Sequence, residues 1–435
     1  MVGLHGALAN NTYVIAEALQ HQGIPTIFIT ESTDTFPFSQ PVWEDISFTL
    51  AYEQIHSNEW TIQKWKDCEK ALNWRAPKFL LQDQLPKSTC ARNKSTAIDP
   101  TRFNTIERLL AWLIMFRKSP RNRHIVTLMQ KADVWVVCGI NATLLAWLSG
   151  KPFVIWPHGG DIRFAAGHGF KLRNLFGHEL LNELRRWLLR QAYSKACYIG
   201  THDPTGIAGH VMPGTYDVDW FPIPHPNRET KLHAKDRHYS LAATLKELGV
   251  NVPSATYYIF IPSRIDFFWK GTDRLFDAIR KVMPKHTAFI FSGWGLDYPA
   301  VSREFSDHPL LCFLPCSVSK PILYRLFAGV DLVVDQFLLG SYGTSAVEAM
   351  SCGTPVMMHI ADKAFHQKGW MPPPVINVST SEEIASVLNR IDNGLFDFEP
   401  YRKATLTWFQ HTHDEKVAVP LIMKRIHESL GETHV

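Results

Sequence analysis

The sequence predicts an α/β protein with two Rossmann-like, doubly wound domains that face each other across a cleft. Its 435 residues are too many for one ordinary hydrophobic core, so two domains are expected. Short apolar runs alternate with helical segments in both halves of the chain, which is typical of βαβ units around a parallel sheet. A cluster of prolines in residues 213–227 cannot continue a helix or a central strand, and it marks the junction between the halves.

Residues 1–225 are predicted to form the N-terminal domain, with an irregular insertion at residues 31–130. One helix is expected within the insertion, near residues 55–72. Only two residues precede Gly3, so the opening strand is expected to be clipped, very short or supplied differently. The other strands are expected at residues 26–30, 134–138, 152–156 and 196–200, with helices at 13–21, 141–148 and 179–193.

Residues 226–410 are predicted to form the second domain, in which the alternation of strands and helices restarts. Residues 411–435 have helical periodicity and are expected to pack back on the N-terminal domain. Strands are expected at residues 257–261, 288–292, 311–314, 332–334 and 355–359, with helices at 272–282, 320–327 and 344–351.

Composition favours an ordinary soluble protein, with 46% hydrophobic and 20% charged residues. The net charge of +4 is too mild to indicate a nucleic-acid partner. Seven scattered cysteines do not form a disulfide framework, so a reducing cytoplasm is expected. The first residues lack the features of a secretory signal, and no apolar run reaches the roughly 20 residues that span a bilayer.

The segment LLGSYGTSAVEAMSCGTPV, residues 338–356, has the pattern of a phosphate-binding turn. Gly340 and Gly343 allow tight backbone turns, and Thr344 opens a helix whose N-terminus suits an anion. Glu348 lies one turn into that helix, where a carboxylate could accept hydrogen bonds from vicinal ribose hydroxyls. The alternative is a plain loop and helix with an exposed glutamate.

A second segment, IPSRIDFFWKGTDRL at residues 261–275, places two cations after a strand. Arg264 and Lys270 lie six residues apart at the carboxyl end of this strand, where they could bind a diphosphate. The alternative is a solvated loop with ordinary surface charges.

Together, these segments carry a resemblance to a known family. The order is a strand, SR, five residues, KG and a helix, followed by SGWG, LPCSVSKPILYRLFAGVDLVV and YGTSAVEAMSCGTPV. It resembles the C-terminal domain of retaining nucleotide-sugar glycosyltransferases of the GT-B fold, and the nearest group is family four. The resemblance covers residues 255–358 well. It is looser in the N-terminal domain, at ADVWVVCGI, KPFVIWPHGGDIR and ACYIGTHD.

The resemblance implies a role for each matching residue. Arg264 and Lys270 would hold the donor diphosphate and stabilise the leaving group, and Glu348 would bind the donor ribose. The backbone at Gly343 and Thr344 would contact the phosphates, and His158 would lie against the transferred sugar. Further donor-site candidates are Ser341, Gly340, Gly271 and Gly6, followed by Asp161, Arg163 and Asp335.

One position departs from the family pattern. The family usually has two glutamates separated by seven residues, and the first often touches the donor sugar. Gly340 occupies that first position here. The contact is therefore missing, or it is replaced by Ser341, Asp335 or a backbone amide.

The resemblance implies transfer with retention, without a cofactor or metal, from a UDP or GDP sugar. The acceptor is a glycan, a lipid-linked molecule or a small molecule. No carboxylate stands out as a nucleophile, so a front-face reaction is expected in which the leaving phosphate helps to deprotonate the acceptor. The alternatives are a catalytically silent relative, or a GT-B sugar phosphorylase or epimerase.

Several weaker patterns have plainer explanations. Asp217 and Asp219 form an Asp-x-Asp pair that could bind a metal, but a turn is the simpler interpretation. Apolar and basic residues at 108–124 or 179–190 could make a peripheral membrane contact, or they could be ordinary core-facing helices. Other groups expected to be structural are Cys312 with Cys316, and His411 and His413 with Asp414.

Overall fold

The structure is a computed structural model that describes most of the chain. The described residues are 1–6, 11–30, 37–56, 61–81, 106–116, 119–157, 164–165, 178–204, 218–228 and 234–431. They form two compact units. The first contains residues Met1–Gln40, Thr61–Pro222 and Val419–Val435, and the second contains Pro41–Trp60 and Ile223–Ala418.

The first unit is built on a seven-stranded parallel sheet with the order β4-β2-β1-β5-β6-β7-β8. Helix α6 packs against α7, and α7 packs against α9. The strands are β1 (Val2–His5), β2 (Thr26–Ile29), β4 (Leu80–Leu81), β5 (Val134–Val137), β6 (Phe153–Ile155), β7 (Tyr198–Thr201) and β8 (Val218–Trp220). The helices are α1 (Asn11–His21), α4 (Ile62–Ala71), α5 (Ile106–Phe116), α6 (Pro120–Met129), α7 (Ile140–Ser149) and α9 (His178–Tyr193). Helix α19 (Glu415–Ser429) belongs to this unit from Val419 onward.

The opening strand β1 is short but complete within the sheet. Its four residues are all buried, and it pairs with β2 on one side and β5 on the other. Gly3 is required in this strand because a Cβ there would lie 2.6 Å from the ring of Trp135. The Trp135 indole in turn donates a hydrogen bond to the Met129 carbonyl at 2.9 Å. A very short opening strand, one of the three expected possibilities, is therefore what the structure shows.

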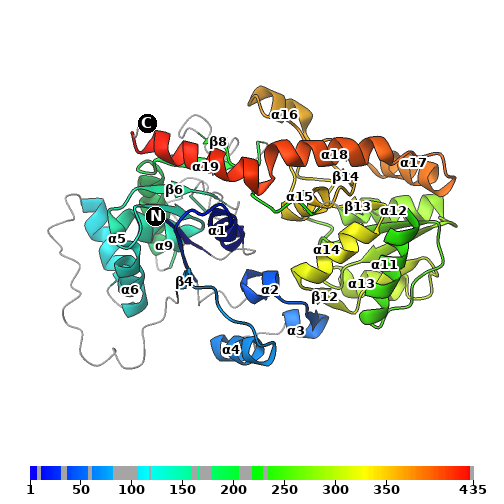
Figure 1. Ribbon diagram of the computed structural model, residues 1–435, viewed down its shortest axis with the longest axis horizontal. Helices are drawn as coiled ribbons and strands as arrows, with labels where there is room; N and C mark the ends of the chain where they lie inside the picture. Colours follow the sequence, from blue (N-terminus) through cyan, green and yellow to red (C-terminus); the bar gives the residue numbers. More distant parts are fainter. Residues whose placement is uncertain are drawn as a thin grey trace. The chain divides into compact units, whose positions relative to one another are not determined.

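The second unit contains a six-stranded parallel sheet with the order β11-β10-β9-β13-β14-β15. Helix α12 packs against α17, and α11 packs against α14 (Figure 1). The strands are β9 (Tyr257–Ile261), β10 (Thr287–Phe291), β11 (Leu311–Phe313), β13 (Leu332–Val334), β14 (Val356–Met358) and β15 (Ile376–Asn377). The helices are α11 (Ala234–Glu247), α12 (Thr272–Val282), α13 (Tyr298–Glu304), α14 (Lys320–Gly329), α15 (Thr344–Ser351), α16 (Asp362–Gln367), α17 (Ser381–Asp392) and α18 (Glu399–Thr412).

Two parallel sheets with alternating helices confirm the predicted α/β class with two Rossmann-like domains. Each strand and helix expected between residues 257 and 359 is present. The apolar runs in this region are buried, as in β10, where all five residues are inaccessible to solvent. Helices α11, α13, α16 and α17 and strand β15 were not expected from the sequence.

Residues Pro41–Trp60 belong to the second unit, which differs from the expected insertion of the first domain. Strand β3 (Thr49–Ala51) pairs antiparallel with β12 (Cys316–Val318), so that Leu50 lies opposite Ser317. The described part of this segment also contains helices α2 (Val42–Asp45) and α3 (Tyr52–His56), and α2 packs against α14. The pairing partner lies about 270 residues away, and the local sequence pattern contains no signal for such a distant contact.

Gly271, directly before α12, gives a stability prediction. Its φ is +66°, and a Cβ there would lie 2.8 Å from the Cγ of Leu338. We expect Gly271→Ala to lose about 1–2 kcal/mol of unfolding free energy from backbone strain, and about 1 kcal/mol more from the Leu338 clash. Gly353→Ala is the matched control, since its φ is +72° and no atom lies within 4 Å of its Cβ position. Urea unfolding measures the unfolding free energy of both variants. Equal losses in Gly271→Ala and Gly353→Ala would show that Leu338 moves aside without an energetic cost.

Candidate functional site

The loop that joins β13 to α15 is held in shape by Gln336, whose side chain is buried. Its amide nitrogen donates to the carbonyls of Ser341 and His359, at 2.5 and 3.2 Å. Its amide oxygen accepts from the backbone N–H groups of Leu338 and Leu339, at 2.9 and 2.6 Å. An amide group offers two donors and two acceptor lone pairs, so this side chain is fully used in closing the loop.

Gly340 lies in the left-handed region at the tip of this loop, with φ +68°. Its carbonyl accepts a hydrogen bond from the Ala361 N–H at 2.9 Å. A Cβ on residue 340 would meet the Ala361 Cβ at 3.0 Å and the His359 Nε2 at 3.6 Å. The loop therefore requires glycine here on two counts, and this turn does not fit a glutamate at position 340. Sequence reasoning did not single out His359, which is the polar side chain beside this position.

Lys270 contacts the same loop. Its Nζ lies 2.9 Å from Oδ1 of Asp335, which is fully buried directly after β13. The Ser263 hydroxyl donates to the same carboxylate oxygen. The backbone links the two loops as well, because the Phe337 N–H donates to the Lys270 carbonyl at 2.8 Å. The structure thus places the predicted cation Lys270 and the candidate Asp335 in one ion pair.

Asp266 organises the loop that carries Lys270. This buried carboxylate accepts from the Trp269 N–H at 2.8 Å and lies 2.9 Å from the Arg264 Nε. Its backbone carbonyl also accepts from the Lys270 N–H at 3.0 Å. Arg264 is therefore held at its Nε edge, while 40% of its side chain remains exposed. Sequence reasoning missed Asp266, although a carboxylate two residues after Arg264 was a usable signal.

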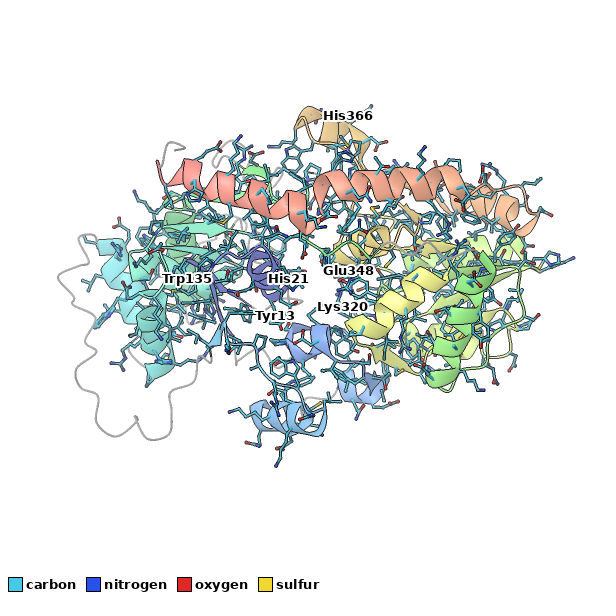
Figure 2. All side chains as sticks on the ribbon, in the orientation of Figure 1. Tyr13, His21, Trp135, Lys320, Glu348 and His366 are labelled. Carbon is cyan, nitrogen blue, oxygen red and sulfur yellow. The ribbon has the colours of Figure 1, made fainter. Side chains whose placement is uncertain are left out.

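Glu348 on α15 is fully buried, and its carboxylate forms an ion pair with Lys320. Figure 2 shows Lys320 on α14 and Glu348 on α15, and the Lys320 Nζ donates to Oε1 of the carboxylate. Burial raises the pKa of Glu348, and Lys320 and Arg228 oppose that rise. The exposed-glutamate alternative is therefore wrong.

Four buried polar atoms near the N-terminal end of α15 have no hydrogen-bond partner among the described residues. They are Asp335 Oδ2, Ser341 Oγ, Glu348 Oε2 and His359 Nδ1. Gly343 precedes the helix, and a Cβ there would lie only 3.6 Å from Asp335 Oδ2. Buried polar groups are nearly always paired in folded proteins, so such a group of unpaired atoms indicates a place where a polar ligand or water binds.

The remaining candidates lie elsewhere. Gly6 follows β1 in the first unit with φ +127°, and a Cβ there would lie 2.3 Å from the Cys138 carbonyl oxygen. Gly6 is thus required by close backbone packing. Three candidates of the PHGGDIR segment, His158, Asp161 and Arg163, lie outside the described residues.

Among the residues of the weaker sequence patterns, those that the structure describes have structural roles. Asp219 pairs with Arg425 at 2.7 Å, and Asp217 lies outside the described residues. His413 is buried and hydrogen-bonded to Ile223 and the Tyr342 hydroxyl. Burial raises the pKa of the Cys312 thiol to about 12. Within the described part of the chain, no group of three His, Cys, Asp or Glu side chains could hold a metal ion.

The two candidate membrane segments are helical, and their described basic side chains are mostly used within the first unit. Arg108 donates to the Trp147 carbonyl at 3.2 Å, and Arg190 donates to the Ala165 carbonyl at 2.6 Å. Arg186 pairs with Glu183. No helix among the described residues is long and apolar enough to cross a membrane. Exposed apolar side chains nevertheless remain on both helices, namely Ile106, Leu109 and Leu113 on α5 and Leu180, Leu181 and Trp187 on α9.

Comparison with known proteins gives matches in structure but not in sequence. No protein-family model matches the chain, and no curated protein matches it. The structure of HepE from Anabaena in complex with UDP and glucose aligns with a TM-score of 0.57 at 14% identity, covering 98% of both chains. Sucrose-phosphate synthase from Thermosynechococcus elongatus aligns with a TM-score of 0.55 at 15% identity, covering 99% of this chain and 98% of the other. This chain has the GT-B fold.

A third solved structure with a different name shares this fold. It is described as a putative UDP-N-acetylglucosamine 2-epimerase from Listeria monocytogenes, and it aligns with a TM-score of 0.50 at 11% identity. The alignment covers 100% of this chain and 97% of the other. At these identities the likeness establishes the GT-B fold alone, and the chemistry has to be argued from the site.

His225 gives a second prediction, on pH and stability. Its imidazole is buried, neither ring nitrogen has a partner among the described residues, and its pKa is lowered well below the usual value. Burial is the main cause, followed by the nearby charge of Lys320 and the effects of His413 and Arg228. The unfolded chain takes up a proton below about pH 6.5 whereas the folded chain does not, so stability should fall as the pH drops below that value.

We expect this one group to remove at most about 1.4 kcal/mol of unfolding free energy per pH unit in that window. Urea unfolding at pH 7.5, 6.5 and 5.5 measures the slope, and His225→Leu is the comparison. Other titrating groups contribute equally to both proteins. An identical pH slope in the variant would contradict the prediction.

Proposed function

We propose that this protein is a glycosyltransferase that moves a sugar from a nucleotide-diphosphate donor to an acceptor with retention of configuration. The observation that carries the proposal is the group of four unpaired buried polar atoms beside the N-terminus of α15, with Lys270 paired to Asp335 among them. A helix N-terminus next to a fixed cation suits a diphosphate, and buried acceptor oxygens suit the hydroxyls of a ribose and a sugar. The GT-B fold supports the same conclusion.

In the proposed reaction, the bond between the anomeric carbon and the diphosphate oxygen breaks, and negative charge grows on the phosphate. Lys270 and Arg264 would stabilise that charge, helped by the backbone N–H groups of Gly343 and Thr344. Asp335 and Asp266 hold the two cations in place, so little reorganisation is required. The leaving phosphate would accept the acceptor proton on the same face of the sugar, with His158 against the ring.

The donor is proposed to be a UDP or GDP sugar, without a resident metal or cofactor, and the acceptor a glycan, a lipid-linked molecule or a small molecule. The test is to incubate the protein with UDP-, GDP- and ADP-sugars, with acceptors of each kind and with EDTA, and to measure released nucleotide. Release that requires an acceptor and survives EDTA, with the product linkage matching the donor anomer, supports the proposal. A product of inverted configuration would overturn retention, and loss of activity in EDTA would overturn metal independence.

Three alternatives remain testable in the same reactions. Gly340 stands at the position where the family pattern has a glutamate. The absence of that glutamate favours a silent relative, which binds a nucleotide sugar or another partner without turnover. The structural match to a putative epimerase favours a GT-B epimerase, and a sugar phosphorylase is a third possibility. Binding without any product would identify the silent relative. An epimerised nucleotide sugar, or phosphate-dependent release of a sugar phosphate, would identify the other enzymes.

We also propose that the protein works in the cytoplasm, with α5 or α9 touching an anionic membrane surface. The exposed apolar side chains on these helices support the contact, and the exposed Arg185 on α9 adds a positive charge. Flotation with anionic vesicles tests it, and the absence of binding would rule the contact out.

A further inference from the structure

We infer that Lys320 is a positioning residue of the donor site, which fixes the Glu348 carboxylate by one oxygen and leaves the other oxygen to accept from the ribose hydroxyls. This rests on the proposed function and adds a residue to its site. It also narrows the expected role of Glu348, because only one oxygen of the carboxylate remains available to a ligand.

The position of Lys320 is fixed by the elements around it. Lys320 is the first residue of α14, and the residue before it, Ser319, is fully buried. Ser319 makes two hydrogen bonds with Phe48: its N–H donates to the Phe48 carbonyl at 3.0 Å, and its hydroxyl accepts from the Phe48 N–H at 2.9 Å. The β3–β12 pair adjoins this contact. The start of α14 is therefore anchored, and Lys320 is directed at Glu348 on α15 (Figure 2).

The two Glu348 oxygens have different surroundings. Oε1 accepts from the Lys320 Nζ, whereas Oε2 is buried and has no partner among the described residues. The Lys320 side chain is itself 13% exposed and that of Glu348 is not exposed at all. A carboxylate bound at one oxygen by an ion pair cannot rotate freely, so its second oxygen is held in one place as an acceptor.

The charges around the pair act on the pKa of both partners. Burial raises the pKa of Glu348, Lys320 and Arg228 oppose that rise, and Asp335 adds to it. Burial lowers the pKa of Lys320, but Glu348 and Glu44 raise it, and its net pKa lies above the usual value.

The neighbouring elements contribute the other titratable groups that face this pair. The Arg228 guanidinium lies 3.8 Å above the ring of Tyr324, which is on the same helix as Lys320. His225 is held neutral by burial. Cys352, which follows α15, is a thiol whose pKa burial raises to about 12. Arg228 is the cation among these groups, and its guanidinium lies over the Tyr324 ring, whereas Lys320 donates directly to Oε1. Removing Lys320 therefore leaves a buried carboxylate that gains a proton more readily.

The consequence for a ligand is a change in how binding depends on pH. A carboxylate accepts a stronger hydrogen bond from a hydroxyl than a neutral carboxyl does. Without Lys320, the pKa of Glu348 rises further, and the acceptor is neutralised as the pH falls through that raised pKa. The intact protein keeps Lys320 beside the carboxylate, which opposes the rise in the Glu348 pKa, so its affinity should change less over the same range.

The experiment measures the binding of UDP and GDP, and of their 2′-deoxy and 3′-deoxy forms, to the full-length protein by calorimetry between pH 6 and 9. We expect Lys320→Met to bind the ribonucleotide about tenfold more weakly or worse at pH 6, and to recover affinity as the pH rises. Its preference for the ribonucleotide over one of the deoxy forms should shrink. Lys320→Arg should restore most of the affinity at pH 6 and most of the preference for the ribonucleotide, because the positive charge is kept.

Lys281→Met is the matched control, since Lys281 on α12 forms a solvent-exposed ion pair with Glu382 on α17. It should bind as the wild type does at every pH. Lys320→Gln keeps a donor for Oε1 without the charge, and it replaces Lys320→Met if that variant does not fold.

The outcomes separate the two proposals. If the wild type binds no nucleoside diphosphate, the proposed function fails. If the wild type binds one and the Lys320 variants show the same affinity, pH profile and ribose preference, the positioning role fails while the proposed function stands.

Discussion

Lys270→Ala should lose turnover by about 100-fold or more, because a fixed cation at the leaving phosphate is often worth roughly 3 kcal/mol of transition-state stabilisation. In the structure, this cation is already held 2.9 Å from the buried Asp335 carboxylate, so its position does not depend on a ligand. Initial rates of nucleotide release, measured at saturating donor, give the change in kcat. Donor affinity should fall less than turnover does, since charge on the phosphate grows as the bond breaks.

Two controls make this result interpretable. Lys281→Ala removes an exposed lysine from α12, the helix that follows Lys270, and should keep the wild-type rate. Lys270→Arg keeps the positive charge and should recover part of the lost turnover, although the geometry of the two side chains differs. A wild-type kcat for Lys270→Ala would show that the phosphate does not lie at this position.

Glu348→Leu should destabilise the protein by about 3–5 kcal/mol, because it leaves the Lys320 ammonium buried without its partner. The double variant Lys320→Met/Glu348→Leu should regain most of that stability, since an apolar pair replaces an ionic one of similar volume. Neither variant should bind a nucleoside diphosphate well. Urea unfolding measures the stability and calorimetry measures the binding.

This double-variant cycle separates a structural pair from a functional one. Recovered stability together with lost binding would show that the ionic pair is retained for the ligand. If the double variant were as unstable as Glu348→Leu, the cost would have to arise from packing around α15 instead. If it bound nucleotide normally, Glu348 would have no part in the donor site.

Local patterns were enough to predict most of the second unit. The run at β10 and the glycine turn before α15 are visible in the sequence because burial and backbone conformation restrict which residues fit. Lys270 and Asp335 were both identified as candidates, but their pairing depends on two loops meeting at the ends of β9 and β13. Spacing along the chain contains no information about that distance.

Other parts of the site could not be predicted for a related reason. Lys320 looks like an ordinary first residue of a surface helix, and only the packing of α14 beside α15 makes it the partner of Glu348. His359 follows a buried strand, and its importance comes from the missing side chain at Gly340. The exchange of a glutamate for glycine was visible in the sequence. The left-handed turn that accompanies it was not.

The placement of Pro41–Trp60 has a practical consequence for dissecting this protein. The chain passes between its two units at Gln40/Pro41, Trp60/Thr61, Pro222/Ile223 and Ala418/Val419, so neither unit is a continuous stretch of the gene. A fragment that begins at Ile223 would lack β3 and leave the edge of β12 open, ready to pair with another molecule. It would also lose Phe48, which anchors the start of α14 through Ser319. The second unit alone should therefore be expressed with residues 41–60 supplied as a second chain or joined by a linker.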